Sequence, residues 1–146
     1  MKTIIFVCHG SICRSPAASL IFNHLKAKYN LQDYTSFARA TSLEEIGNDI
    51  YPPMKRVLIE HDVPLIRHYA QRLTNQEIEE ADIIFYMDNN NYRNLVRQYG
   101  ENKKYVLISK YLDDMEIEDP WYTDRYEFVF DKIYRSIEAI INTLIK

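Results

Sequence analysis

The chain has 146 residues, of which 47% are hydrophobic and 27% charged, a length and balance typical of one folded domain rather than a disordered segment. Its formal net charge of -3 argues against binding to nucleic acid through a basic surface. No apolar run approaches the roughly 18 residues that cross a bilayer, and the N-terminus carries no signal-peptide pattern. We therefore expect a cytoplasmic protein that binds neither nucleic acids nor membranes.

Two scarce residue types cluster near the N-terminus. The chain has only two cysteines and three glycines, and Cys8, Gly10 and Cys13 lie close together. Two thiols are too few for a disulfide scaffold or a four-thiolate zinc site. The histidines at 24, 61 and 68 show no metal-ligand spacing with them. The sequence therefore predicts neither a metal nor a cofactor.

The first half of the chain alternates strand and helix patterns. A β-branched and aromatic run at 2–8 predicts a buried strand. Apolar residues then recur at helical spacing, and Pro16 suits a first helical turn, so we expect a helix over 16–29. Residues 34–40 predict a second strand, and a proline pair opens a helix over 52–60.

Capping signals mark the helices of the next segment. Thr74 and Glu77 have the spacing of a capping box, which predicts a short helix over 74–80. A strand-like run follows at 82–87. Asp88 is then placed to cap another helix, since its side chain can accept backbone N–H groups.

The C-terminal third predicts a last strand at 104–108, an acidic loop at 109–122 and a long amphipathic helix from Thr123 onward. Strands that alternate with helices indicate an α/β fold whose mainly parallel sheet is covered on both faces. No repeat or linker divides the chain, so we expect one domain over 1–146. Such sheets bind ligands beyond the carboxyl ends of their strands, where Cys8 lies.

The segment from Cys8 to Pro16 has the composition of a phosphate-binding loop. A tight loop before a helix N-terminus turns backbone N–H groups inward, and these bind a phosphate-sized anion. Arg14 can hold two phosphate oxygens at once, and Gly10 permits a backbone conformation closed to bulkier residues. The same dipoles favour the nucleophilic thiolate of Cys8, to which Ser15 can donate a hydrogen bond.

This segment resembles the signature of the low-molecular-weight protein tyrosine phosphatases. The likeness extends over nearly the whole chain, through Glu45-Ile46-Gly47-Asn48, residues 68–74, Met87-Asp88 and Asp119-Pro120. It implies a four-stranded parallel sheet flanked by helices (a Rossmann-like three-layer sandwich) and metal-free hydrolysis through a phosphocysteine. The implied phosphate-binding loop comprises Cys8, His9, Gly10, Ser11, Ile12, Cys13, Arg14 and Ser15.

An acid from another loop has to protonate the leaving oxygen. The segment 113–119 offers several carboxylates, and its composition does not choose among them. The similarity of Asp119-Pro120 to the acid motif of the family selects Asp119. The expected reaction is a double displacement in which Cys8 attacks phosphorus, and Asp119 first protonates the leaving group and then activates water. The expected product is inorganic phosphate.

The substrate pocket is expected to suit a flat aryl ester, so its partner would be a phosphotyrosine protein or a small aryl phosphate. Glu44 falls where many relatives place an aromatic residue, and a carboxylate there is expected to repel dianions. Ile12 counts against the related protein-arginine phosphatases, which tend to carry threonine at this position. The expected pocket residues are Ile12, Glu44, Asn48, Trp121 and Tyr122.

Three further positions follow from the resemblance. Ser11 stands where the family usually has asparagine, which tolerates a left-handed backbone better. His68 matches a position in a hydrogen-bond network behind the loop, with Ser15 as a partner. Cys13 matches a resolving thiol that can trap oxidised Cys8 as a disulfide.

Other functions stay open at this point. An arsenate reductase would need further shuttling cysteines, and the chain has none outside the loop. A phosphocysteine carrier or phosphate-binding module would need neither Arg14 nor the Asp119-Pro120 acid. For the assembly we expect a monomer or a weak dimer.

Overall fold

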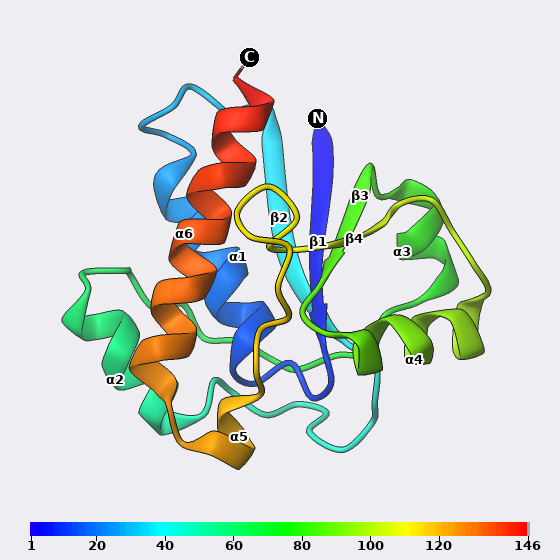
Figure 1. Cartoon of the computed structure of the whole chain (residues 1–146), viewed down its shortest axis with the longest axis horizontal. Coiled ribbons are helices and arrows are strands. Elements are labelled where there is room, and N and C mark those ends of the chain that lie inside the picture. Colours follow the sequence, from blue (N-terminus) through cyan, green and yellow to red (C-terminus); the bar gives the residue numbers. More distant parts are fainter. Residues whose placement is uncertain (146) are drawn as a thin grey trace.

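A parallel sheet of four strands, in the order β2-β1-β3-β4, lies at the centre of the computed structural model, which describes residues 1–145 (Figure 1). The strands are β1 Lys2–Cys8, β2 Tyr34–Ala40, β3 Ile83–Tyr86 and β4 Tyr105–Leu107. The predicted strands at 2–8 and 34–40 are confirmed, and the two at 82–87 and 104–108 are each shorter by one residue at both ends.

Helices cover both faces of this sheet, as predicted. They are α1 Arg14–Leu25, α2 Pro52–Glu60, α3 Asn75–Glu80, α4 Asn89–Tyr99, α5 Pro120–Thr123 and α6 Tyr126–Leu144. Figure 1 shows α1, α2 and α6 on one side, with α3 and α4 on the other. The fold is thus a three-layer α/β sandwich.

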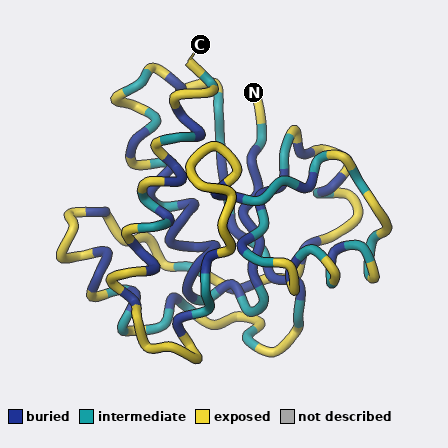
Figure 2. Tube along the Cα trace, in the orientation of Figure 1, coloured by how far each residue is buried: buried dark blue, intermediate teal, exposed yellow. Residues whose placement is uncertain are grey.

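Alternation along β1 explains the two buried layers. Ile4 and Phe6 belong to the core cluster beneath α1 and α6, whereas Ile5 and Val7 belong to the cluster beneath α3 and α4. Successive side chains of a strand point to opposite faces, so a strand covered on both sides reads as a continuous apolar run. Figure 2 shows this strand buried along most of its length, with the exposed residues mainly in loops and on outer helix faces.

The first helix differs from its predicted bounds. It begins at Arg14 rather than Pro16, because helical hydrogen bonding already starts in the loop, where the Ala17 N–H donates to the Cys13 carbonyl at 3.2 Å. It ends at Leu25 rather than Tyr29, and Asn30 follows in a left-handed conformation with φ 57°. That turn redirects the chain into β2.

The expectation of a plain acidic loop over 109–122 is wrong at its end. Asp119 and Pro120 open the short helix α5, in which the Asp119 side chain accepts the Trp121 N–H at 3.0 Å. Asp124 then adopts a left-handed conformation with φ 62°, which delays the last helix from Thr123 to Tyr126. An aspartate before a proline is an N-cap signal followed by a suitable first helical residue.

The other capping predictions are confirmed. Thr74 and Glu77 form a capping box at α3, and Asp88 caps α4 by accepting the Asn91 N–H at 2.8 Å. Asp88 therefore lies just beyond β3, on the same edge of the sheet as Cys8 at the end of β1. None of the helices within residues 1–145 is long and apolar enough to cross a membrane.

Candidate active site

The Cys8 sulfur lies buried at the base of the loop between β1 and α1. Its residue is 3% exposed, and the Ser15 backbone N–H donates to Sγ at 3.4 Å. The Ser15 hydroxyl lies 3.3 Å from the same sulfur. Both contacts come from the first turn of α1, where the helix dipole also favours negative charge. The first turn of α1 therefore holds the sulfur in place at the base of the loop.

The left-handed residue of this loop is Ser11, with φ 56°, and not Gly10, whose φ is not positive. The expectation that Gly10 supplies an otherwise forbidden backbone conformation is therefore wrong. Space is tight at Gly10, since an added Cβ would lie 3.1 Å from Cγ of Glu45, whose side chain would have to shift. Ser11 adopts the conformation for which asparagine is better suited, so the departure from the family pattern falls on a strained position.

His68 supports Ser11 from behind the loop. Its ring Nε2 donates to the Ser11 carbonyl at 2.5 Å, and its backbone N–H donates to Asp49 Oδ1 at 3.0 Å. The Ser11 hydroxyl then contacts the Ser15 hydroxyl at 2.8 Å. His68 thus reaches Ser15 through Ser11. Burial lowers the pKa of His68 although the bond to Ser11 opposes the shift, which favours a neutral ring.

Arg14 ties together three loops that follow different strands. Its guanidinium donates from Nη1 to Asp88 Oδ2 at 2.7 Å and to the Ile117 carbonyl at 2.9 Å, and Nη2 lies 3.5 Å from Asp119 Oδ2. Only 2% of Arg14 is exposed. Burial alone lowers the pKa of Arg14, but the neighbouring Cys8, Asp88 and Asp119 outweigh it and raise that pKa. The side chain therefore remains a cation.

Asp88 has a second role that sequence reasoning missed. One carboxylate oxygen caps α4, while the other accepts the Arg14 hydrogen bond. The two side chains are 74 positions apart in the chain, so no local pattern joins them. The available signals were the place of Asp88 just after a strand and its presence in a segment that resembles the family.

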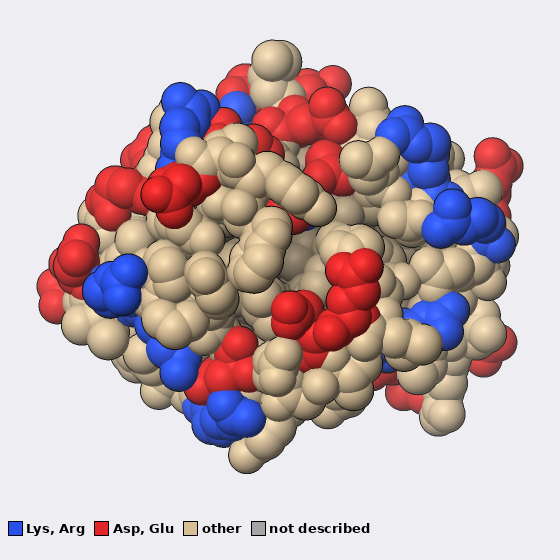
Figure 3. Space-filling view, turned by 90° about the horizontal axis from the view of Figure 1, so that it is seen from below, with Lys and Arg blue, Asp and Glu red and all other residues tan. Residues whose placement is uncertain are grey.

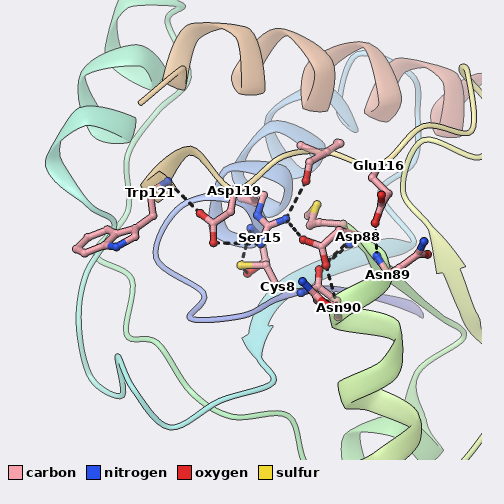
Figure 4. A network of polar contacts seen from close by, with 12 residues as sticks. Cys8, Ser15, Asp88, Asn89, Asn90, Glu116, Asp119 and Trp121 are labelled. Atoms are coloured by element: carbon pink, nitrogen blue, oxygen red, sulfur yellow. Dashed lines mark hydrogen bonds and ion pairs between the residues drawn. The ribbon is translucent and has the colours of Figure 1, made fainter. Parts of the chain in front are cut away.

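Asp119 is the carboxylate of the acidic segment that lines the pocket of Cys8. Figure 4 shows it between Trp121 and Cys8, with one oxygen engaged by the Trp121 backbone N–H. Three of the neighbouring carboxylates are bound elsewhere: Asp113 to Lys132, Glu116 to the Asn89 N–H, and Glu118 to Arg125. The choice that composition left open therefore falls on Asp119 by position.

The pocket above Cys8 has a volume of about 140 Å³. It brings together the loop residues from Cys8 to Arg14 with the predicted wall residues Glu44, Trp121 and Tyr122. Asn48 lies outside this pocket, in an adjoining hollow, where its side chain donates to Glu45 Oε2 at 2.9 Å. Glu45, which was not predicted, lines the pocket in its place.

Acidic side chains gather beside the hollow on this face of the molecule (Figure 3). Glu44 is paired with His9, whose Nε2 lies 2.7 Å from the Glu44 carboxylate. This contact places His9 beside the carboxylate that was expected to repel dianions. Trp121 packs against Tyr51 with ring centroids 5.0 Å apart, and half of its surface stays exposed to face a ligand.

Cys13 lines the same pocket as Cys8, and both thiols are free. Burial, together with the nearby Cys8 and Asp119, raises the pKa of the Cys13 thiol well above its usual range. The two cysteines therefore differ: burial keeps Cys13 protonated, whereas the Cys8 sulfur accepts a hydrogen bond from the Ser15 backbone N–H. Within residues 1–145, no group of His, Cys, Asp and Glu side chains is arranged to hold a metal ion.

The double role of Asp88 gives a testable separation of its two contacts. Asp88→Asn keeps an oxygen that can cap α4 but leaves the buried Arg14 without its charged partner, so we expect a loss of about 1.5–3 kcal/mol in the free energy of unfolding. Asp88→Ala removes the cap as well, which adds about 1 kcal/mol. Urea unfolding of both variants beside the wild type measures this. If Asp88→Asn matched the wild type while Asp88→Ala did not, Asp88 would act only as a helix cap.

Comparison with known proteins agrees with this geometry. The family model described as low molecular weight phosphotyrosine protein phosphatase matches residues 3–146. The human low molecular weight phosphotyrosine protein phosphatase is 33% identical over 152 residues, covering 96% of this chain and 94% of the relative. The low molecular weight protein-tyrosine-phosphatase PtpA of Staphylococcus saprophyticus is 29% identical over 150 residues, covering 100% and 96%.

Among solved structures, YfkJ from Bacillus subtilis superposes with a TM-score of 0.93 at 27% identity, over 99% of this chain and 94% of that one. The match therefore includes every strand, the loop that follows β1 and the segment that carries Asp119. The chain belongs to the low molecular weight phosphotyrosine protein phosphatases, a family of protein-tyrosine phosphatase enzymes.

Proposed function

We propose that this protein hydrolyses phosphotyrosine and other aryl phosphate monoesters through a phosphocysteine formed on Cys8. The observation that carries the proposal is the convergence of Cys8, Arg14 and Asp119 on one small pocket. A nucleophile, a fixed cation and a carboxyl group are the three components that such a double displacement requires.

In the proposed mechanism, the Cys8 thiolate attacks phosphorus while the alcohol oxygen leaves on the opposite side. Arg14 holds the equatorial phosphate oxygens, and a protonated Asp119 gives its proton to the leaving oxygen. Asp119, now a carboxylate, removes a proton from water, which attacks the phosphocysteine and releases inorganic phosphate and the Cys8 thiolate. Catalysis depends on positioning and charge complementarity around the transferred phosphoryl group.

The shape of the pocket supports an aryl ester as substrate. Ile12, Trp121 and Tyr122 border the space above the sulfur, and the partly exposed Trp121 ring offers a flat apolar surface to a phenyl group. The two curated relatives described above are named as phosphatases of phosphotyrosine or of protein tyrosine. We therefore infer a phosphotyrosine protein as the substrate class.

A phosphocysteine carrier remains the second candidate, and Asp119 argues against it. A carrier passes its phosphoryl group to another acceptor and has no need of a carboxyl group in the nucleophile's pocket. Asp119 lies there, 3.5 Å from the arginine that would bind the phosphate. This placement favours hydrolytic turnover.

Hydrolysis of p-nitrophenyl phosphate and of a phosphotyrosine peptide tests the function directly. Turnover should persist in EDTA, be inhibited by vanadate, and fall by several orders of magnitude in Cys8→Ser, since the hydroxyl is a far weaker nucleophile at neutral pH. Acid-quenched wild type should carry phosphate on Cys8. Phosphoserine and phosphoarginine peptides serve as specificity controls. Turnover that survives in Cys8→Ser would contradict the mechanism, and phosphocysteine that accumulates without turnover would identify a carrier.

The role of Asp119 is tested by varying the leaving group. Asp119→Ala should slow phenyl phosphate hydrolysis about 10²–10⁴-fold, because phenolate leaves poorly without a proton. The loss with p-nitrophenyl phosphate should be much smaller, since p-nitrophenolate is stable as an anion. Asp113→Ala is the matched control, because its carboxylate belongs to the same segment but pairs with Lys132. Equal losses on both esters would refute the acid role.

For Cys13 we infer a protective role during oxidation. Peroxide converts the Cys8 thiolate to a sulfenic acid with release of hydroxide, and the Cys13 sulfur can then attack the Cys8 sulfur to form a disulfide with release of water. After mild peroxide treatment, mass spectrometry should find a Cys8–Cys13 disulfide that dithiothreitol reverses. In Cys13→Ser, Cys8 should instead proceed to sulfinic acid. Wild type that shows only over-oxidised Cys8 would reject this role.

A further inference from the structure

A second hollow adjoins the catalytic pocket along α4. Its volume is about 510 Å³, and four residues line both this hollow and the pocket: His9, Arg14, Asp119 and Tyr122. From there it continues over the exposed face of α4 as far as Arg97. Figure 4 shows the start of this helix, with Asn89 and Asn90, next to Asp88. We call this hollow the α4 groove.

Two arginines give the α4 groove a positive charge. Arg93 and Arg97 both line it, both are exposed, and they lie one helical turn apart. Within residues 1–145, neither forms an ion pair with a carboxylate. Each donates instead to an uncharged asparagine oxygen three residues earlier, Asn90 or Asn94. Those bonds orient the guanidinium groups without neutralising them.

The carboxylates in the α4 groove cancel only part of its positive charge, because three arginines and two aspartates line it. The two that line it are Asp88 and Asp119, and both lie against Arg14. Glu44 and Glu45 also line the catalytic pocket, and Glu44 pairs with His9, which lines both the pocket and the α4 groove. Charges of both signs therefore border the mouth of the pocket: the carboxylates of Glu44 and Glu45 line the pocket, and the guanidinium groups of Arg93 and Arg97 line the α4 groove.

We propose that the α4 groove binds acidic side chains, aspartate or glutamate, that lie next to the phosphotyrosine of a protein substrate. This assignment rests on the proposed function, because it places the substrate's phosphate in the catalytic pocket. Guanidinium groups pair well with carboxylates. Residues four apart on a helix are separated by about 6 Å along its axis. This is close to the roughly 6.6 Å between alternate residues of an extended peptide, whose side chains point to the same side. Arg93 and Arg97 are thus specificity-determining residues outside the chemistry.

Binding of non-hydrolysable peptides tests the assignment without relying on turnover. The probes are phosphonate analogues of one phosphotyrosine peptide whose flanking residues are glutamates, glutamines or lysines. Fluorescence anisotropy would measure their affinity for the wild type, for the double variant Arg93→Gln with Arg97→Gln, and for Arg56→Gln. Arg56 is a matched control, because it is an exposed arginine on α2 that lines neither the pocket nor the α4 groove.

The wild type should bind the glutamate peptide about three- to tenfold more tightly than the glutamine peptide at low salt, as expected for two exposed ion pairs. The ratio should fall toward one at roughly 0.5 M salt, where such pairs are screened. The double variant should bind the glutamate and glutamine peptides equally well, with the same affinity for the glutamine peptide as the wild type. Arg56→Gln should keep the preference for the glutamate peptide. A ratio that survives in the double variant, or that Arg56→Gln lowers equally, would overturn the assignment.

Parallel hydrolysis of the phosphotyrosine versions separates this inference from the proposed function. Turnover without a glutamate preference would overturn the α4 groove assignment and leave the phosphatase function intact. A glutamate preference in binding without turnover would support the α4 groove and overturn the function. Absence of binding to every phosphonate peptide would overturn both.

Discussion

The buried guanidinium of Arg14 is the constraint on which the active site depends. A cation with 2% exposure is tolerable in a protein interior only if partners replace its lost hydration. Those partners come from the loop after β3, through Asp88, and from the segment after β4, through Ile117 and Asp119. The requirement to satisfy one charge thus fixes the relative positions of three loops, and with them the distance from the nucleophile to the acid.

Features with a local physical signal could be predicted from the sequence, and features set by distant contacts could not. The apolar run of β1 and the capping box at Thr74 depend on neighbours in the chain, and both are confirmed. The short helix α5 was missed because four residues are too few to show a helical period. The partnership of Arg14 with Asp88 joins residues far apart in the sequence, so only the folded chain reveals it.

The loop after β1 shows where a prediction from sequence misses the local backbone geometry. The resemblance identified the residues of the loop, but general knowledge of glycine assigned the unusual backbone to Gly10. The structure puts it on Ser11, and makes Gly10 a point of close approach by Glu45. The same limit applies to the pocket wall, where Glu45 lines the pocket and Asn48 lies beside it. Which of two adjacent side chains faces a ligand is decided by the path of the loop, and composition does not encode that path.

The contacts that hold Ser11 in its left-handed conformation all come from the protein itself. The His68 ring donates a hydrogen bond to the Ser11 carbonyl, and the Ser15 hydroxyl contacts the Ser11 hydroxyl. Asp49 in turn accepts the backbone N–H of His68. These contacts order the loop as part of the fold, and a pre-ordered loop loses less entropy when a phosphate binds. At Ser11, backbone strain lowers the stability of the fold, whereas the ordered loop raises the affinity for a ligand. A substitution that let this backbone relax would relieve strain in the folded protein. The loop would then have to be ordered each time a phosphate binds, which would lower the affinity.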